Sequence, residues 1–293
     1  MLFSGIGLDV GMSAPAARVA FVTGASSGIG RATALRLARS GYRVFATVRT
    51  EDAETSVLQE AAGLLLNVIR LDLLDGAAIS RAVRTVVDLS GRIDVVVNNA
   101  GYGQLGAVED LSRDVLRRQF EVNVFAASQI CREVVPMMRV QRSGTIVNVS
   151  SIAGRVSVPL LGAYCASKFA LEALSDALRV ETRSFGVRVV LIEPGPVMTQ
   201  FQEAVRWSRT LLPPESVYER SYDEGFAGSR SRYAATPERV AQVVLRAIES
   251  ARPRARYRIR LADGVVARLV RVIPTGVLDW GVARWSGLHR RAE

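Results

Sequence analysis

Short apolar runs alternate with longer segments of helical periodicity from residue 18 onward. Most of the runs are continuously apolar, which is typical of strands covered on both faces. Such alternation predicts βαβ units built into an α/β domain with a parallel sheet. Strands are predicted at 19–23, 43–48, 65–71, 93–98, 145–150, 187–193 and 256–261. Helices are predicted at 28–40, 53–62, 76–90, 112–140, 163–185 and 236–251.

No internal repeat or linker divides the pattern, so a single domain is predicted over residues 18–261. The preceding residues, 1–17, are expected to be a disordered leader. They carry an acidic residue and several glycines where a signal peptide needs a basic and then an apolar stretch, and Met12 is an alternative start. The last residues, 262–293, are expected to form a basic helical tail.

The charge is concentrated near the C-terminus. The chain has a formal net charge of +10, and residues 252–293 contain ten arginines against three acidic residues. The rest of the chain is only modestly basic and shows no zinc-finger or aromatic-rich RNA-binding pattern, so nucleic-acid binding is disfavoured. Arginines on alternate residues from Arg252 to Arg260 predict a partly exposed strand with one basic face. We expect the tail to pack on its own domain or a neighbouring subunit, the alternative being an anionic membrane surface.

The cysteines and the apolar runs indicate the compartment. Cys131 and Cys165 fall in predicted helices without metal-ligand spacing, so reduced thiols in a cytoplasmic protein are expected, and no metal site. No apolar run reaches the roughly 20 residues that span a bilayer.

A glycine-rich turn joins the first predicted strand to the first helix. Glycines let the backbone turn tightly and approach a ligand closely, and the start of a helix attracts phosphate. The Gly-x-x-x-Gly-x-Gly spacing differs from both the Gly-x-Gly-x-x-Gly fingerprint and the P-loop. The turn therefore predicts a dinucleotide site by its position; its candidate residues are Gly24, Ser26, Ser27, Gly28, Ile29 and Gly30.

Lys168 is the single lysine among 38 lysine and arginine residues, and it follows Tyr164 by four positions in a predicted helix. Residues at that spacing share a helix face, so the ammonium is expected beside the phenol. A nearby cation favours the phenolate and lowers its pKa. Tyr164 is therefore a candidate acid/base catalyst, although Tyr-x-x-x-Lys also arises by chance.

Two polar segments follow strands whose carboxyl ends should face the ligand. Asn98, Ala100 and Gly101 belong to an Asn-Asn-Ala-Gly turn after the fourth strand, and Ser150 and Ser151 end the fifth. Taken alone, the first could be a plain turn and the second a helix cap.

Together these motifs resemble the short-chain dehydrogenase/reductase superfamily, in its compact form. The shared elements, in family order, are Thr-Gly-x-x-x-Gly-x-Gly at 23–30, Asn-Asn-Ala-Gly at 98–101, Asn123, Ser151, Tyr164-x-x-x-Lys168 and Pro194-Gly195. The resemblance covers about residues 18–251. It implies a Rossmann-type, doubly wound sheet of about seven parallel strands.

The resemblance also implies a catalytic tetrad. Tyr164 would exchange a proton with the substrate oxygen, and Ser151 would hydrogen-bond that oxygen. Lys168 would favour the phenolate and hold the nicotinamide ribose, and Asn123 would hold a water that connects Lys168 to solvent. The cofactor supplies the hydride.

The second strand bears on cofactor choice. Val48 occupies the position where NAD enzymes usually place an acid, and Arg49, suited to a 2′-phosphate, follows it. NADP(H) is therefore favoured, with NAD(H) possible. Further cofactor contacts implied by the resemblance are Asp72, Leu73, Pro194, Gly195, Val197 and Thr199, in addition to Tyr164 and Lys168.

Residues 197–233 are longer than a plain connector and contain several aromatic residues, which indicates a lid over an apolar substrate or a surface loop held by aromatic side chains. We interpret the chain as an NADP(H)-dependent oxidoreductase that interconverts a secondary alcohol and a ketone or aldehyde of lipophilic type. Family members usually form dimers or tetramers. Two alternatives stay open: a catalytically silent dinucleotide sensor, and a peripheral membrane-associated lipid-modifying reductase.

Overall fold

The computed structural model describes residues 17–222, 234–260, 272–286 and 288. Within them, seven strands form one parallel sheet in the order β3-β2-β1-β4-β5-β6-β7, as the doubly wound prediction requires. The strands are β1 (Val19–Val22), β2 (Arg43–Val48), β3 (Leu66–Arg70), β4 (Val95–Asn98), β5 (Gly144–Val149), β6 (Val187–Glu193) and β7 (Arg256–Arg258).

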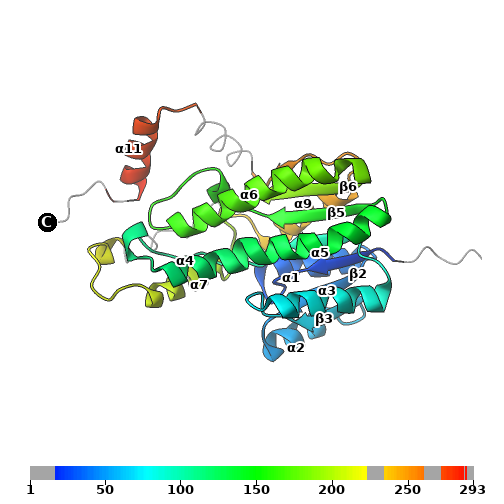
Figure 1. The fold of residues 1–293 in the computed structure, drawn as a ribbon. Coiled ribbons are helices and arrows are strands. Elements are labelled where there is room, and N and C mark those ends of the chain that lie inside the picture. Colours follow the sequence, from blue (N-terminus) through cyan, green and yellow to red (C-terminus); the bar gives the residue numbers. More distant parts are fainter. Residues whose placement is uncertain (1–16, 223–233, 261–271, 287, 289–293) are drawn as a thin grey trace, which may run out of the picture.

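Helices cover both faces of the sheet (Figure 1). One face carries α1 (Gly28–Arg39), α2 (Glu51–Glu60) and α9 (Pro237–Glu249). The other carries α3 (Gly76–Ser90), α5 (Ala126–Val140) and α6 (Gly162–Thr182). The other described α-helices are α4 (Arg113–Phe120), α7 (Phe201–Trp207) and α11 (Thr275–Trp285).

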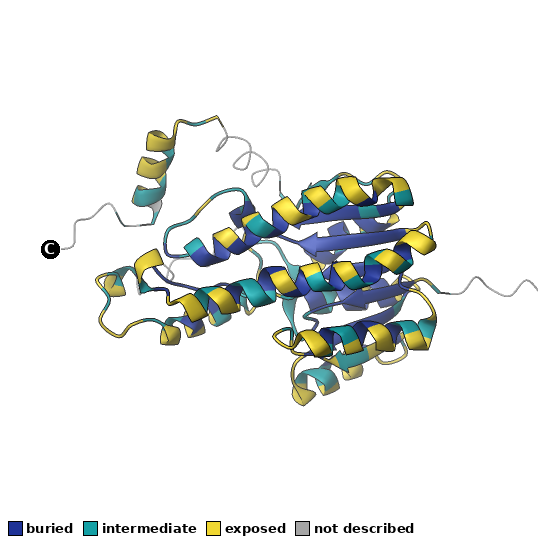
Figure 2. Ribbon diagram, viewed as in Figure 1, coloured by how far each residue is buried: buried dark blue, intermediate teal, exposed yellow. Residues whose placement is uncertain are grey.

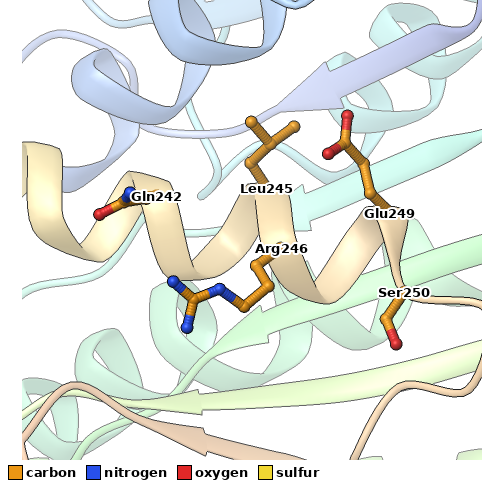
Figure 3. Close-up of a pocket in the computed structure, with 5 residues that line it drawn as sticks. All are labelled: Gln242, Leu245, Arg246, Glu249 and Ser250. Atoms are coloured by element: carbon orange, nitrogen blue, oxygen red, sulfur yellow. The ribbon is translucent and has the colours of Figure 1, made fainter.

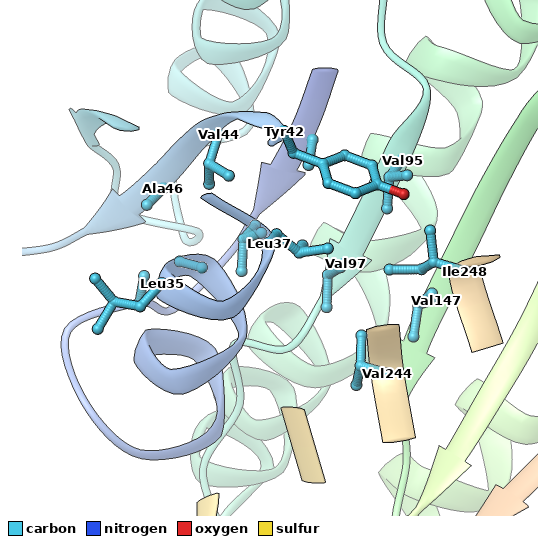
Figure 4. Packing of buried hydrophobic residues seen from close by; sticks show 14 of the residues in the cluster. Leu35, Leu37, Tyr42, Val44, Ala46, Val95, Val97, Val147, Val244 and Ile248 are labelled. Carbon is cyan, nitrogen blue, oxygen red and sulfur yellow. The ribbon is translucent and has the colours of Figure 1, made fainter. Parts of the chain in front are cut away.

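Apolar residues of the strands point alternately into the two layers of helices. On the side of α1 and α9, Leu37, Val97 and Val244 belong to one buried cluster, drawn in Figure 4. On the opposite side, Phe21 and Ile130 belong to a second cluster. Figure 2 shows the result: buried strands between helices whose outer faces are exposed. The continuous apolar runs of the sequence thus reflect strands with two buried faces.

One long predicted helix is interrupted. Residues 112–140 were expected to be continuous, but a π-helical turn, η2 (Glu121–Phe125), separates α4 from α5. Single π-helical turns inside helices occur frequently at functional sites. This turn contains the predicted site residue Asn123, whose side chain is buried.

Other boundaries moved by small amounts for local reasons. α2 begins at Glu51, two residues before the predicted start, because the Thr50 side chain accepts a hydrogen bond from Ala53 N and caps the helix. The last strand, predicted over 256–261, is shorter in the structure, at Arg256–Arg258.

The predicted leader and parts of the lid and tail, residues 1–16, 223–233 and 261–271, lie outside the described residues, so these predictions stay open there. Of the lid, α7 and the 3-10 turn Ser208–Leu211 are described. Of the tail, α11 is described, and it carries the exposed side chains of Val277 and Trp280.

Candidate active site

The carboxyl ends of the neighbouring strands β1 and β4 bring the glycine-rich turn and the Asn-Asn-Ala-Gly turn together. The Thr23 hydroxyl accepts hydrogen bonds from Asn99 N (3.1 Å) and Ala100 N (3.2 Å). The Asn99 side chain donates in return to Thr23 O (3.0 Å) and Gly24 O (3.1 Å). Asn99 was absent from the predicted site residues, although its place inside the motif was a signal that it mattered.

The glycines of the turn are required by close packing. A Cβ on Gly30 would lie 2.1 Å from Gly24 O and 2.3 Å from Asn99 Nδ2. Gly24 has φ +69°, and a Cβ there would lie 2.8 Å from Ala100 Cα. Such distances exclude any side chain, so the two turns can meet only because these positions are glycine.

The start of α1 fits a dinucleotide phosphate. Ser27 precedes the helix but its side chain caps no backbone N–H, and the first turn holds no acidic residue. Free N–H groups and the positive end of the helix dipole therefore face the glycine-rich turn. Ser26 and Ser27 are half-buried there, whereas the Ile29 side chain packs against the core and leaves its backbone for a ligand.

Tyr164 and Lys168 lie on α6 beside the end of β5, as predicted. Lys168 Nζ is 5.9 Å from the centre of the Tyr164 ring and donates a hydrogen bond to Val149 O (2.8 Å). A hydrogen bond joins Tyr164 to Ser151. The Ser151 hydroxyl also accepts from Ala153 N (3.1 Å) and so caps the next turn, the alternative reading of this motif. The Ser151 side chain therefore makes both contacts.

The predicted lowering of the Tyr164 pKa by Lys168 is wrong. Burial raises the pKa of Tyr164 to about 12, and the hydrogen bond with Ser151 opposes this rise. Burial likewise lowers the pKa of Lys168 to about 8, with Glu172 opposing. Burial sets the direction of the Tyr164 pKa here, and the Lys168 ammonium donates to a β5 carbonyl, Val149 O.

The Asn123 side chain binds the loop after β4 and the helix α6 that carries this pair. Its Oδ1 accepts from Tyr102 N (3.1 Å), and its Nδ2 donates to Tyr102 O (3.0 Å) and Ser167 Oγ (3.0 Å). A Cβ on Gly101 would lie 3.0 Å from Asn123 Oδ1 and 3.6 Å from Lys168 Nζ. The structure therefore brings Asn123, Gly101 and Lys168 together; the predicted water contact of Asn123 stays a prediction.

Other predicted cofactor residues are spread along the same edge. The buried Asn98 side chain donates to Asn148 Oδ1 (2.8 Å) and so binds the neighbouring strand β5. Arg49 is exposed after β2. The exposed Asp72 forms a local turn by accepting from Leu74 N (3.0 Å), and Leu73 is half-buried against the core.

The loop after β6 returns to the glycine-rich turn. A Cβ on Gly28, which has φ +55°, would lie 3.0 Å from Thr199 Cγ2. Pro194 O accepts from Ile152 N (3.0 Å), and the half-buried Gly195 and Val197 connect these two points. The loop thus reaches from Ser151 to the start of α1.

Apolar side chains cover the other side of Tyr164. The Phe201 ring, at the start of α7, lies 5.3 Å from the Tyr164 ring, measured between centres. Phe201 packs against two clusters, whose buried members are Ala153, Tyr164 and Cys165, and Leu105, Ala107, Leu160, Val205 and Tyr222. The aromatic residues Phe226 and Tyr233, in the predicted lid range 197–233, lie outside the described residues.

A separate hollow lies along α9 (Figure 3). Its lining residues are Gln242, Leu245, Arg246, Glu249 and Ser250, none of them a predicted site residue. In the described part of the chain no group of acidic, histidine or cysteine side chains could hold a metal ion. There too, no helix is long and apolar enough to cross a membrane.

The profile of the short chain dehydrogenase family matches residues 18–209. The chain is 37% identical to the uncharacterised oxidoreductase YbbO of Escherichia coli strain K12 over 260 residues, 88% of this chain and 91% of YbbO. It is 34% identical to bovine (Bos taurus) retinol dehydrogenase 8, over 90% of this chain and 88% of that protein. It is 35% identical to human (Homo sapiens) 17-beta-hydroxysteroid dehydrogenase type 1, over 82% and 76%.

A Burkholderia phymatum short-chain dehydrogenase/reductase solved with NAD superposes with a TM-score of 0.75 at 28% identity, covering 86% of this chain and 92% of that one. A metagenomic short-chain oxidoreductase solved with NADP gives a TM-score of 0.66 at 31% identity, covering 82% and 96%. The fold and the extent of these matches agree, and both solved relatives were crystallised with a nicotinamide dinucleotide. The chain belongs to the short-chain dehydrogenase/reductase family of oxidoreductases.

Proposed function

We propose that this protein interconverts a secondary alcohol and a ketone or aldehyde on a lipophilic molecule, with NADP(H) preferred over NAD(H). The observation that carries the proposal is the grouping of Ser151, Tyr164 and Lys168 at the end of β5, beside an apolar wall. A protein that only senses a dinucleotide needs the glycine-rich turn but has no use for this grouping.

Tyr164 is the proton-transferring group. At neutral pH a phenol with a pKa of about 12 is protonated, and this form donates a proton to the oxygen of a carbonyl substrate. Ser151, hydrogen-bonded to Tyr164, lies where it can donate to the same substrate oxygen and stabilise its developing charge. In the oxidation direction the proton passes from the alcohol to Tyr164.

The cofactor contacts follow from the edge of the sheet. The backbone at Gly24–Gly30 and the start of α1 would hold the phosphates of a bound dinucleotide, and Ala100, Gly101 and Thr199 would contact its nicotinamide half. Lys168 would hold the ribose hydroxyls, and Asn123 would anchor a water that connects Lys168 to solvent. When bound, the dinucleotide supplies or accepts the hydride.

The preference for NADP(H) rests on the end of β2. Val48 is buried there, at the position where NAD enzymes usually place an acid, and the exposed Arg49 can contact a 2′-phosphate. Solved relatives carry either NAD or NADP. The arginine is thus the feature that favours NADP(H) in this chain.

The lipophilic substrate rests on the clusters around Phe201, which present apolar surface beside Tyr164. Two relatives are named for a retinol and a hydroxysteroid, both lipophilic alcohols. The buried free thiols of Cys131 and Cys165 fit a reducing cytoplasm. We also expect a homodimer or homotetramer, to be tested by light scattering after size exclusion.

The test is a panel of ketones, aldehydes and secondary alcohols, of graded chain length, followed at the nicotinamide absorbance with both cofactors. Turnover is expected to be fastest with apolar carbonyl compounds and NADPH. Binding of NADPH without turnover of any compound would favour the silent sensor instead. Equal kcat/KM for short polar and long apolar compounds would overturn the lipophilic assignment.

A further inference from the structure

A buried group of charged residues lies immediately behind the catalytic residues. Glu172 of α6 and Glu193 at the end of β6 are 3% and 0% exposed. Two carboxylates this deep need cationic partners, because an unpaired buried charge costs several kcal/mol.

The edge strand β7 supplies those partners. The Arg256 guanidinium lies 3.0 Å from Glu172 Oε2, 3.0 Å from Glu193 Oε1 and 2.6 Å from Asp176 Oδ2. Arg258 Nε donates to Glu193 Oε2 at 2.7 Å. The alternate arginines of the sequence were predicted to form a basic face on a partly exposed strand. Two of them instead bind buried acids, with their own side chains only 20% and 22% exposed.

Glu172 is the member of this group that adjoins the catalytic residues. It follows Lys168 by four residues on α6, as Lys168 follows Tyr164, so all three lie along one helix face. A Cβ on Gly154 would lie 2.9 Å from Ser150 Oγ, 3.0 Å from Glu172 Cγ and 3.1 Å from Lys168 O. Glycine at 154 therefore lets the Ser150–Ser151 turn pack directly on this part of α6.

We propose that Glu172 is a positioning residue for Lys168: its carboxylate, held by Arg256, supports the ammonium from the turn of α6 that follows it. The inference rests on the proposed role of Lys168. It adds a function for β7, whose Arg256 keeps Glu172 in place.

The charges around both groups agree with this assignment. Lys168 is faced by the Tyr164 ring, the Asn123 amide and Val149 O, so Glu172 is the carboxylate among the described residues that raises the Lys168 pKa against burial. Glu172 itself is faced by Arg256, by Arg155 at 3.9 Å, by Glu193 and by Ser150. Burial raises the pKa of Glu172, Ser150 lowers it, Glu193 raises it further and Arg256 lowers it.

The experiment uses the fact that Lys168 is the only lysine. Full-length protein labelled with ¹³Cε-lysine gives one lysine signal, whose pH titration reports the Lys168 ammonium directly. In Glu172→Gln the midpoint is expected to fall by about one pH unit, because the ammonium loses its opposite charge. The alkaline limb of the kcat profile should move down with it, while the KM for NADPH changes little.

Asp176→Asn is the matched control. It also removes a carboxylate from Arg256, but one helical turn farther from Lys168 and 41% exposed, so the lysine midpoint should stay in place. An unchanged midpoint in folded Glu172→Gln, or an equal fall in both variants, would overturn the proposal. If Glu172→Gln does not fold, Glu172→Asp decides by the same readout, with a smaller fall expected. The titration needs no turnover, so a failure of the proposed enzymatic function leaves this result readable.

Discussion

Two regions of the molecule differ in the contacts that hold them together: the carboxyl ends of β1, β4 and β5, called the site edge below, and the region after β6. At the edge, short segments meet because neighbouring parallel strands end together, and glycines let Gly24 and Ala100 come into contact. After β6, apolar packing around Phe201 and the ion pairs of β7 join residues far apart in sequence. The first kind of contact leaves a local motif in the sequence, and the second does not.

The largest effect is expected from removing the phenol oxygen at the edge. Tyr164→Phe should lower kcat by about 10²- to 10⁴-fold, because proton transfer to the substrate is lost. The dissociation constant for NADPH, measured by fluorescence titration, should stay within about threefold, since the ring and its contact with Phe201 remain. Turnover close to wild type would refute the proton-transfer role.

Replacing a glycine by alanine, which adds one methyl group, compares how tightly the site edge and the tail are packed. Gly30→Ala should destabilise the protein by about 1–3 kcal/mol or more and weaken NADPH binding, because its Cβ would overlap Gly24 O and Asn99. Gly281→Ala, in α11, has nothing within 4 Å of its Cβ and should be neutral or stabilise by up to about 1 kcal/mol.

Urea unfolding monitored by circular dichroism measures both variants. The comparison fails if Gly281→Ala loses as much stability as Gly30→Ala, since the tail would then be packed as tightly as the edge.

The next prediction concerns Arg49, an exposed residue after β2, and its effect on the binding of NADPH relative to NADH. Arg49→Ala should weaken NADPH at least about tenfold and NADH less than about twofold, because a charge-assisted contact to the 2′-phosphate disappears. Arg39→Ala, an exposed arginine at the end of α1, is the control for a general loss of positive charge. Equal losses for the two cofactors in Arg49→Ala would defeat the 2′-phosphate assignment.

Much of the fold and part of the candidate site could be predicted from the amino-acid sequence. The fold followed from apolar runs and the pairing of Tyr164 with Lys168 from helix spacing, whereas the place of Ser151 beside them followed from the family resemblance. The direction in which the Tyr164 pKa shifts could not be predicted in this way. Helix spacing places two groups near each other, but it gives neither their burial nor the partner of the ammonium, here Val149 O. The π-helical turn at Asn123 also left no pattern, because its side-chain bonds to Tyr102 and Ser167 come from distant segments.

The smallest effect is expected at the tail, where packing on the domain competes with membrane binding. The half-buried Leu288 packs against the apolar cluster of Leu105 and Tyr222, whereas Trp280 is 68% exposed. Leu288→Ala should therefore destabilise more than Trp280→Ala, which should stay within about 0.5 kcal/mol of wild type.

With vesicles of anionic phospholipid, the full chain and a chain lacking residues 262–293 should both remain in the supernatant. Sedimentation of the full chain alone, abolished by Trp280→Ala, would instead assign the tail to a lipid surface, because an exposed tryptophan beside arginines suits the boundary between headgroups and acyl chains.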